Sequence, residues 1–323
     1  MCPDQWVAGR MDAADQELLG RAARANQGPD RTEFSTAALA SLAREEGLDF
    51  ATAALYDLVS RRPETVEFRS QLRGALGRSR GKSTILIGII PGAFHREHKR
   101  TGADGRRVVE LFRRAGFRAE TVPLASFASL RENSRAIVDW LEQRGEERVL
   151  LVSLSKGSAD LKIALSLPEA KEAWRRVGGW VSLSGLAQGT PLVGWLRTRR
   201  LHWFGVQLLF WWRGYRRSVL EELDHGAGTP LAGWPRVPPH WRVAHVCGFP
   251  LRRHLKHPWA LRGYERVASL GPNDGGGILL GDTLTWPGAI VPIWGVDHYL
   301  QPDWDCEPLL GNILTAAADS MQA

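Results

Sequence analysis

The spacing of hydrophobic residues changes near residue 83. In residues 37–43 and 53–59, apolar side chains recur every three to four positions, which predicts two amphipathic helices, and Gly47 separates them. This part of the sequence contains no constellation of catalytic side chains. We therefore predict that residues 1–80 form an N-terminal helical extension.

Beyond residue 83, short apolar runs alternate with segments of helical length. The run at residues 84–90 is continuous and rich in β-branched side chains, which is typical of a strand buried on both faces. Strands separated by helices imply crossover connections, so residues 81–323 are predicted to form an α/β domain with a mostly parallel sheet. Further strands are predicted at residues 119–124, 149–152, 180–183, 243–247 and 289–294, and helices at residues 106–115, 129–143, 160–167 and 307–318.

One interval is too long for a simple crossover. About sixty residues separate the strands predicted at residues 180–183 and 243–247. We predict that residues 190–240 form an inserted helical cap. Its tryptophans and arginines have two interpretations: they cover the sheet and the active site, or they form an amphipathic surface for peripheral contact with a membrane. The tryptophans are Trp195, Trp203, Trp211, Trp212 and Trp234.

The most informative junction is the segment Ser-Leu-Ser-Lys-Gly at residues 153–157. It connects a predicted strand to a predicted helix through too few residues for anything but a sharp turn. A serine at the apex of such a turn is held in a strained backbone conformation with its hydroxyl exposed above the sheet. Acyl-transfer enzymes hold their nucleophile in this position, so Ser155 is the candidate nucleophile.

A serine nucleophile needs a base and an acid that orients the base. The base is expected after the last strand, where His298 follows the run at residues 289–294. The acid is expected between nucleophile and base, in the loop after the preceding strand. Asp274, in an Asn-Asp-Gly turn, is the first choice and Asp282 the second. The order Ser155, Asp274, His298 is the one that this architecture uses.

Backbone N–H groups must stabilise the oxyanion that forms during acyl transfer. One donor is expected from Lys156, the residue after the nucleophile. A second is expected in the loop after the strand at residues 84–90, where Gly92 permits a close turn. The N–H of Ala93 or Phe94 is the predicted second donor.

Composition narrows the class of protein. Of 323 residues, 44% are hydrophobic and 24% are charged, which is typical of a globular protein. The net charge of +7 comes mostly from scattered arginine, so it permits an anionic partner without predicting nucleic acid. Three cysteines without metal-ligand spacing favour a reducing, cytoplasmic location. We find no signal peptide and no apolar run of membrane-spanning length.

Two other motifs predict no function. The segment Gly-Lys-Ser-Thr at residues 81–84 imitates a phosphate-binding loop, but its nearest upstream glycine, Gly77, is one residue too close and the segment leads into a strand. His95 and His98 have metal-like spacing without a further set of ligands. We therefore predict neither a nucleotide nor a metal, and no cofactor.

Several segments together resemble the α/β-hydrolase superfamily. Residues 181–191 resemble the strand and loop that follow the nucleophile in lipase-like members. Residues 273–275, with Pro-Gly-Ala at 287–289 and Gly-Val-Asp-His at 295–298, resemble their acid and histidine segments. The match covers about residues 83–318 and implies hydrolysis of carboxylic esters without a cofactor. The chain departs from the usual pattern in three ways. Ser153 replaces the first glycine of G-x-S-x-G, and a lysine, Lys156, follows the nucleophile. No His-Gly pair precedes the oxyanion loop.

Three functional hypotheses follow. The first is a serine hydrolase that cleaves esters or thioesters with a hydrophobic acyl part through an acyl-enzyme. The second is an acyltransferase that uses the same site. The third is a catalytically silent protein of hydrolase fold that binds a lipid, an acyl carrier or a membrane through the cap.

Overall fold

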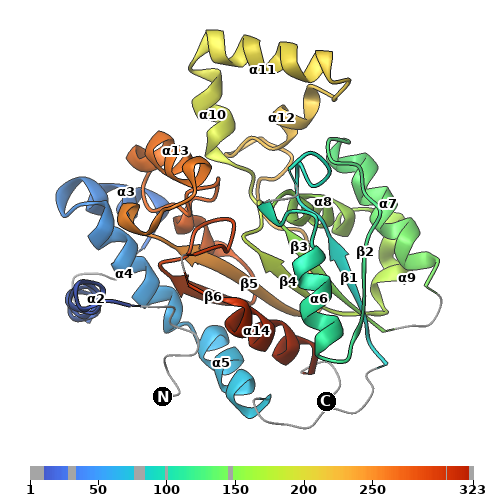
Figure 1. The fold of residues 1–323 in the computed structure, drawn as a ribbon, viewed down its shortest axis with the longest axis horizontal. Coiled ribbons are helices and arrows are strands. Elements are labelled where there is room, and N and C mark those ends of the chain that lie inside the picture. Colours follow the sequence, from blue (N-terminus) through green and yellow to red (C-terminus); the bar gives the residue numbers. More distant parts are fainter. Residues whose placement is uncertain are drawn as a thin grey trace. The chain divides into compact units, whose positions relative to one another are not determined.

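The computed structural model describes residues 11–27, 34–75, 84–98, 101–144, 148–302 and 304–319. One six-stranded sheet has the strand order β2-β1-β3-β4-β5-β6 (Figure 1). The chain divides into two compact units. We call Ala75–Ala244 with Gly311–Ala323 the central unit, and Met1–Gly74 with His245–Leu310 the terminal unit. Cys2 and residues 81–83 of the segment that imitates a phosphate-binding loop lie outside the described residues.

Four parallel strands organise the central unit. The register pairs Leu86 with Arg118 on one side and with Val149 on the other. Four tryptophans join aliphatic side chains in the core of this unit: Trp140, Trp174, Trp180 and Trp241. The strands are β1 (Leu86–Ile90), β2 (Arg118–Thr121), β3 (Val149–Leu154) and β4 (Val177–Leu183). The helices between them are α6 (Arg106–Arg114), α7 (Leu130–Glu142), α8 (Lys156–Leu165) and α9 (Lys171–Trp174), and α14 (Glu307–Asp319) follows at the end of the chain.

The terminal unit joins the N-terminal helices to the last two strands. The ring of Tyr56 meets Phe249 and Trp294 edge-on, with centroids 5.6 Å and 5.2 Å apart. Thr65 Oγ1 donates a hydrogen bond of 2.9 Å to the carbonyl of Ile290. The predicted N-terminal helices therefore pack with residues distant in sequence. These helices are α2 (Ala13–Asn26), α3 (Thr36–Glu45), α4 (Leu48–Ser60) and α5 (Pro63–Ala75). The unit also contains most of β5 (Arg242–Phe249) and all of α13 (Pro258–Val267) and β6 (Ala289–Trp294).

Three helices occupy the interval predicted to form a cap. Phe210 and Val219 of this region pack in one apolar cluster with Phe127 and Ala159. The buried ammonium of Lys162 on α8 donates to the carbonyls of Ala187 and Leu231, which ties the same region to the body of the unit. The helices are α10 (Pro191–Arg197), α11 (Arg200–Trp212) and α12 (Ser218–Glu222), drawn in yellow in Figure 1.

The predicted α/β class and mostly parallel sheet are confirmed, and every predicted strand is present. The helix predicted at residues 53–59 begins five residues earlier, at Leu48, and α8 begins at Lys156 rather than at residue 160. In the described part of the chain, no helix has the length and apolarity needed to cross a membrane.

Candidate active site

Ser155 lies in a strained turn between β3 and α8. Its backbone has φ 47° and ψ −117°, a conformation that residues other than glycine rarely adopt. Hydrogen bonds hold it there: the N–H of Ser155 donates to Leu183 at 3.1 Å, and its carbonyl accepts from Ser158 and Leu186, each at 3.0 Å. The sequence thus builds the sharp strand–turn–helix elbow that its spacing predicts.

Gly157, the last glycine of the motif, is required by close packing. A Cβ at this position would lie 2.6 Å from the carbonyl oxygens of both Ile90 and Pro91. Those atoms belong to backbone at the end of β1, which has little room to move. A glycine is therefore the residue that lets the start of α8 approach β1.

Ser153, which replaces the usual first glycine, has its side chain in a buried polar cluster. Its Oγ accepts a hydrogen bond of 2.7 Å from Trp180 Nε1 and lies 2.7 Å from Ser158 Oγ. Ser158 Oγ in turn lies 2.9 Å from Ser182 Oγ. A buried hydroxyl with partners carries little desolvation penalty, so the serine is accommodated beneath the elbow.

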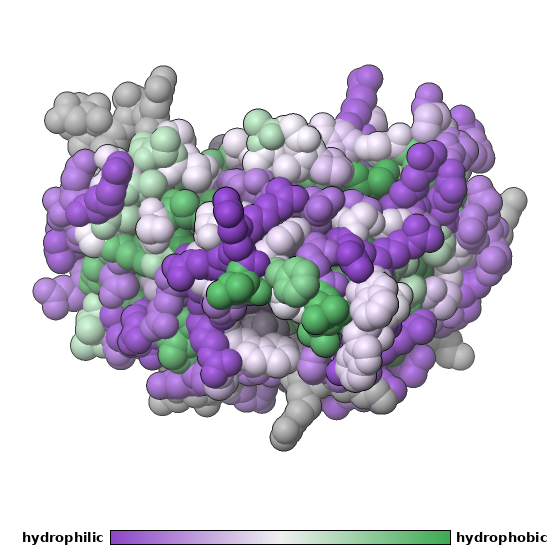
Figure 2. All heavy atoms as spheres, turned by 90° about the horizontal axis from the view of Figure 1, so that it is seen from above, coloured by the Kyte–Doolittle hydropathy of each residue, from purple (hydrophilic) through white to green (hydrophobic). Residues whose placement is uncertain are grey.

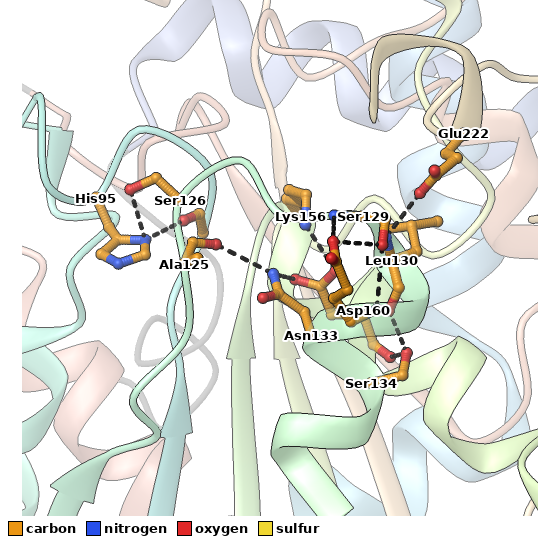
Figure 3. A network of polar contacts seen from close by, with 12 residues as sticks. His95, Ala125, Ser126, Ser129, Leu130, Asn133, Ser134, Lys156, Asp160 and Glu222 are labelled. Atoms are coloured by element: carbon orange, nitrogen blue, oxygen red, sulfur yellow. Dashed lines mark hydrogen bonds and ion pairs between the residues drawn. The ribbon is translucent and has the colours of Figure 1, made fainter. Parts of the chain in front are cut away.

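Lys156 directs its charge into the protein, along its own helix. Its Nζ lies 2.7 Å from Asp160 Oδ1, and both side chains are 1% exposed. Asp160 Oδ2 also accepts from Asn133 Nδ2 at 3.0 Å, and the same amide donates to the carbonyl of Ala125 (Figure 3). Burial raises the pKa of Asp160, while the Lys156 charge and the Asn133 hydrogen bond oppose that rise. This chain of contacts links the elbow to the segment before α7.

The predicted oxyanion loop lies beside the elbow. A Cβ on Gly92 would lie 3.3 Å from Ser155 Cβ, and Phe94 has a positive φ of 57°. His95 Nδ1 lies 2.9 Å from the carbonyl of Gly92. The same nitrogen lies 3.3 Å from Ser126 Oγ, and Figure 3 shows these two side chains facing each other. The loop is therefore tied to the segment that Asn133 also holds.

Lys156 is the other predicted donor. As the first residue of α8, its N–H has no carbonyl four residues earlier inside the helix. The helix dipole adds partial positive charge at this end. Both features suit an N–H that stabilises negative charge near Ser155.

Asp274 and His298 form a buried pair in the terminal unit. His298 Nδ1 lies 2.6 Å from Asp274 Oδ2, and the N–H of His298 donates to the carbonyl of Asp274 at 2.8 Å. The other carboxylate oxygen, Oδ1, accepts from the N–H groups of Gly276, Gly277 and Ile278 at 2.9–3.0 Å. With Oδ1 occupied by backbone donors, the carboxylate presents only Oδ2 to the ring. A proton on Nδ1 then leaves Nε2 able to act as a base.

Gly276 makes this pairing sterically feasible. A Cβ at Gly276 would lie 2.2 Å from Cβ and Cγ of His298. The turn after Asp274 therefore needs a glycine for the imidazole to lie against it. The Asn-Asp-Gly-Gly-Gly run has a packing role as well as a turn role.

Electrostatics raise the pKa of the histidine. Burial alone would lower it, but the charge and hydrogen bond of Asp274, with a further contribution from the charge of Asp297, outweigh burial and raise the pKa of His298. Burial raises the pKa of Asp297 itself to about 6, against a backbone hydrogen bond from Tyr299. A second titratable carboxyl thus adjoins the pair.

The predicted site residues fall into two sets. Ser155, Lys156, Ala93 and Phe94 come together in the central unit, and Asp274 and His298 in the terminal unit. The alternative acid, Asp282, lies in the 3₁₀ turn Leu280–Thr285, and the ring of His298 is paired with Asp274. Among the described residues, no group of three or more His, Cys, Asp or Glu side chains is arranged to hold a metal.

Sequence reasoning missed three contributors: Asn133, Asp160 and Asp297. The spacing of Lys156 and Asp160 by four residues on one helix is a signal that could have revealed their ion pair. Asn133 joins them from another helix, and no local pattern marks it. Asp297 directly precedes the predicted base in the sequence, and its charge contributes to the raised pKa of His298.

Comparison with known proteins gives structural similarity only. No family model matches the chain, and no curated protein sequence matches it. A metagenomic carboxyl esterase, MGS0156, is similar over 76% of this chain and 79% of its own, with 17% identity and a TM-score of 0.48. The mature lipase BlEst2 of Bacillus licheniformis is similar over 70% and 88%, with 17% identity and a TM-score of 0.48. Lipase B of Aspergillus fumigatus is similar over 78% of this chain and 67% of its own, with 15% identity and a TM-score of 0.33.

Proposed function

We propose that this chain is a serine hydrolase that cleaves carboxylic esters or thioesters through an acyl-enzyme on Ser155. The observation that carries the proposal is the positive φ of Ser155 at the junction of β3 and α8, held by hydrogen bonds on both sides. In a strand–turn–helix elbow, this strained backbone conformation exposes the serine hydroxyl to a substrate.

In this mechanism, Ser155 Oγ attacks the carbonyl carbon while His298 Nε2 accepts the hydroxyl proton. Asp274 keeps the imidazole in the tautomer with the proton on Nδ1 and stabilises the imidazolium that forms. The N–H of Lys156 and that of Ala93 or Phe94 donate to the oxyanion. Each such donor contributes about 3 kcal/mol to transition-state stabilisation in measured enzymes.

His298 then protonates the leaving alcohol or thiol as the tetrahedral intermediate collapses to the acyl-enzyme, which completes acylation. In deacylation, His298 takes a proton from water, which attacks the carbonyl carbon of the ester on Ser155. The second tetrahedral intermediate collapses to the free acid as His298 returns the proton to Ser155 Oγ. The reaction needs no cofactor.

We infer a hydrophobic acyl part for the substrate. Phe94, in the loop beside Ser155, meets Phe127 of the apolar cluster of the cap region edge-on, with ring centroids 4.4 Å apart. Apolar and aromatic side chains with a few placed polar groups are typical of small-molecule sites. Nitrophenyl esters of increasing acyl length should therefore be cleaved with rising kcat/KM.

The test compares the native chain with Ser155→Ala and with Ser166→Ala, an exposed serine at the other end of α8. Ester hydrolysis and labelling by a fluorophosphonate probe should vanish in the first variant and persist in the second. Product analysis with added alcohol separates hydrolysis from acyl transfer. A folded native chain that neither hydrolyses esters nor reacts with the probe would refute the proposal and leave a silent binding protein.

A further inference from the structure

Helix α11 has apolar side chains on two opposite faces. Trp203, Val206 and Phe210 recur every three to four residues and pack against the cluster of the cap region; Phe210 is buried. This inner face accounts for how the helix is anchored to the central unit. An ordinary surface helix would carry polar residues on its other side.

The outer face of α11 is apolar and exposed instead. We define it as Leu201, Phe204, Leu208, Trp211 and Trp212, whose spacing places them on one stripe. Leu201 is 88% exposed and Trp212 is 71% exposed. Six of the ten large hydrophobic side chains found exposed among the described residues belong to α11. So dense a concentration on one helix marks an interaction surface rather than scattered surface residues.

Arginines border this face, and acidic residues are missing from the segment. Residues 190–220 contain no Asp or Glu. Arg213 lies over the ring of Trp212, with its guanidinium carbon 5.4 Å from the ring centroid. Figure 2 looks onto this region, where green and pale side chains gather and purple ones border them. The exposed arginines are Arg197, Arg199, Arg200, Arg213, Arg216 and Arg217.

Some of these charges are neutralised within the protein, and others are presented outward. Arg197 pairs with Asp224, and Arg216 pairs with Glu132. Arg199 and Arg200 at the start of α11, Arg213 at its end and Arg217 before α12 remain as exposed cations. The surface therefore has an apolar centre with a basic group at each end.

We propose that the outer face of α11 docks this protein on the surface of anionic lipid bilayers. A helix of 13 residues is about 20 Å long, too short to cross a bilayer, so it would lie in the plane of the interface. Leucine and phenylalanine would enter the acyl boundary, tryptophan would lie at headgroup depth, and the arginines would contact lipid phosphates. The inference goes beyond the proposed hydrolase activity and does not depend on it.

Charge favours a lipid surface over a second copy of this chain. Two such faces brought together would bury arginines against arginines without acidic partners from this segment, which is unfavourable. The exposed leucines Leu201 and Leu208 suit an acyl boundary rather than a nucleic-acid site, where basic side chains and stacking rings track a phosphate backbone.

The test measures binding of the Ser155→Ala chain to sedimented vesicles, so the result does not depend on catalysis. Vesicles of phosphatidylcholine with phosphatidylserine should bind the protein at least tenfold more tightly than phosphatidylcholine alone, and added salt should weaken binding. Leu201→Ser with Phe204→Ser and Trp212→Ser should abolish binding. Val66→Ser, which changes an exposed apolar residue on α5, is the matched control and should bind like the parent.

A second variant separates the two components of the surface. Arg199→Gln with Arg200→Gln, Arg213→Gln and Arg217→Gln should remove the preference for anionic vesicles. Circular dichroism confirms that each variant is folded. Absence of binding to anionic vesicles by the folded parent would overturn the proposal. So would sedimentation equilibrium showing a dimer that the apolar variant dissociates while vesicle binding is unchanged.

Discussion

Two buried aspartates, Asp160 in the central unit and Asp274 in the terminal unit, each bind one basic side chain. Asp160 pairs with the ammonium of Lys156 at 2.7 Å, and Asp274 with the imidazole of His298 at 2.6 Å. The partners differ in what they can do, because imidazole is the side chain that ordinarily accepts and releases a proton near neutral pH. One pair therefore holds backbone in place, and the other can move a proton.

Their remaining contacts support the same distinction. Asp160 is joined by Asn133, whose amide also holds the carbonyl of Ala125, so the carboxylate connects two segments of the fold. Asp274 receives three backbone N–H groups from its own turn, which fix its orientation toward one ring nitrogen. From this difference we expect a substitution at Asp274 to affect activity and one at Asp160 to affect stability.

The largest expected effect is that of Asp274→Asn on activity. An asparagine amide can donate to the ring, which favours the tautomer with the proton on Nε2 and removes the base. We expect kcat to fall by about 10⁴-fold, as the equivalent change does in a serine protease, with the fold retained. Steady-state ester hydrolysis measures it.

Asp282→Asn is the matched control for that experiment, because it changes the alternative acid in the neighbouring turn. It should hydrolyse esters at close to the native rate. Loss of activity in Asp282→Asn, with Asp274→Asn active, would reverse our assignment of the acid.

The next effect in size is that of Asp160→Asn on stability. It leaves the ammonium of Lys156 buried without its counter-charge, so the free energy of unfolding should fall by about 3–5 kcal/mol. The double change Lys156→Met with Asp160→Leu removes both charges and should recover most of that loss. Urea denaturation measures both; an unchanged midpoint for Asp160→Asn would show that the pair is not a structural ion pair.

The smallest expected effect concerns Asp297, which adjoins the Asp274–His298 pair, and it appears in how stability depends on pH. The pKa of Asp297 rises from the model-compound value of 3.8 to about 6 on folding. Between these values the unfolded chain loses this proton and the folded chain keeps it, so stability falls as pH rises and the loss is complete above about pH 6. At about 1.4 kcal/mol per unit, the loss amounts to at most about 3 kcal/mol.

Asp297→Asn tests both consequences of that shift. The fall in stability from pH 4 to pH 6 should shrink in this variant, as measured by urea denaturation at each pH. The charge of Asp297 also raises the pKa of His298, so its removal should lower the apparent pKa of the base in the pH profile of kcat/KM. Profiles that superimpose for both proteins would contradict this link.

The sequence predicted the strands and the elbow because their signals are local. A buried parallel strand is a continuous apolar run, and the Ser-Leu-Ser-Lys-Gly segment allows only a sharp turn. Helix α8 begins four residues before its predicted start, because Gly157 is a poor helix former whose helical state depends on close packing against β1.

Other features depend on residues far apart in the chain. The choice of Asp274 over Asp282 as the partner of His298 depends on the turn at Gly276, which admits the imidazole. The burial of the Ser153 hydroxyl depends on Trp180, 27 residues away, whose indole N–H donates a hydrogen bond to it. The sequence cannot show either contact, because each depends on how the strands are paired and how the loops close.

The central claim is that Ser155 is the nucleophile, and mass spectrometry of the fluorophosphonate-treated chain tests it most directly. We predict a single adduct on the peptide that contains Ser155, formed by the native protein and by Ser166→Ala and absent from Ser155→Ala. An adduct on another serine, formed equally by Ser155→Ala, would contradict the account.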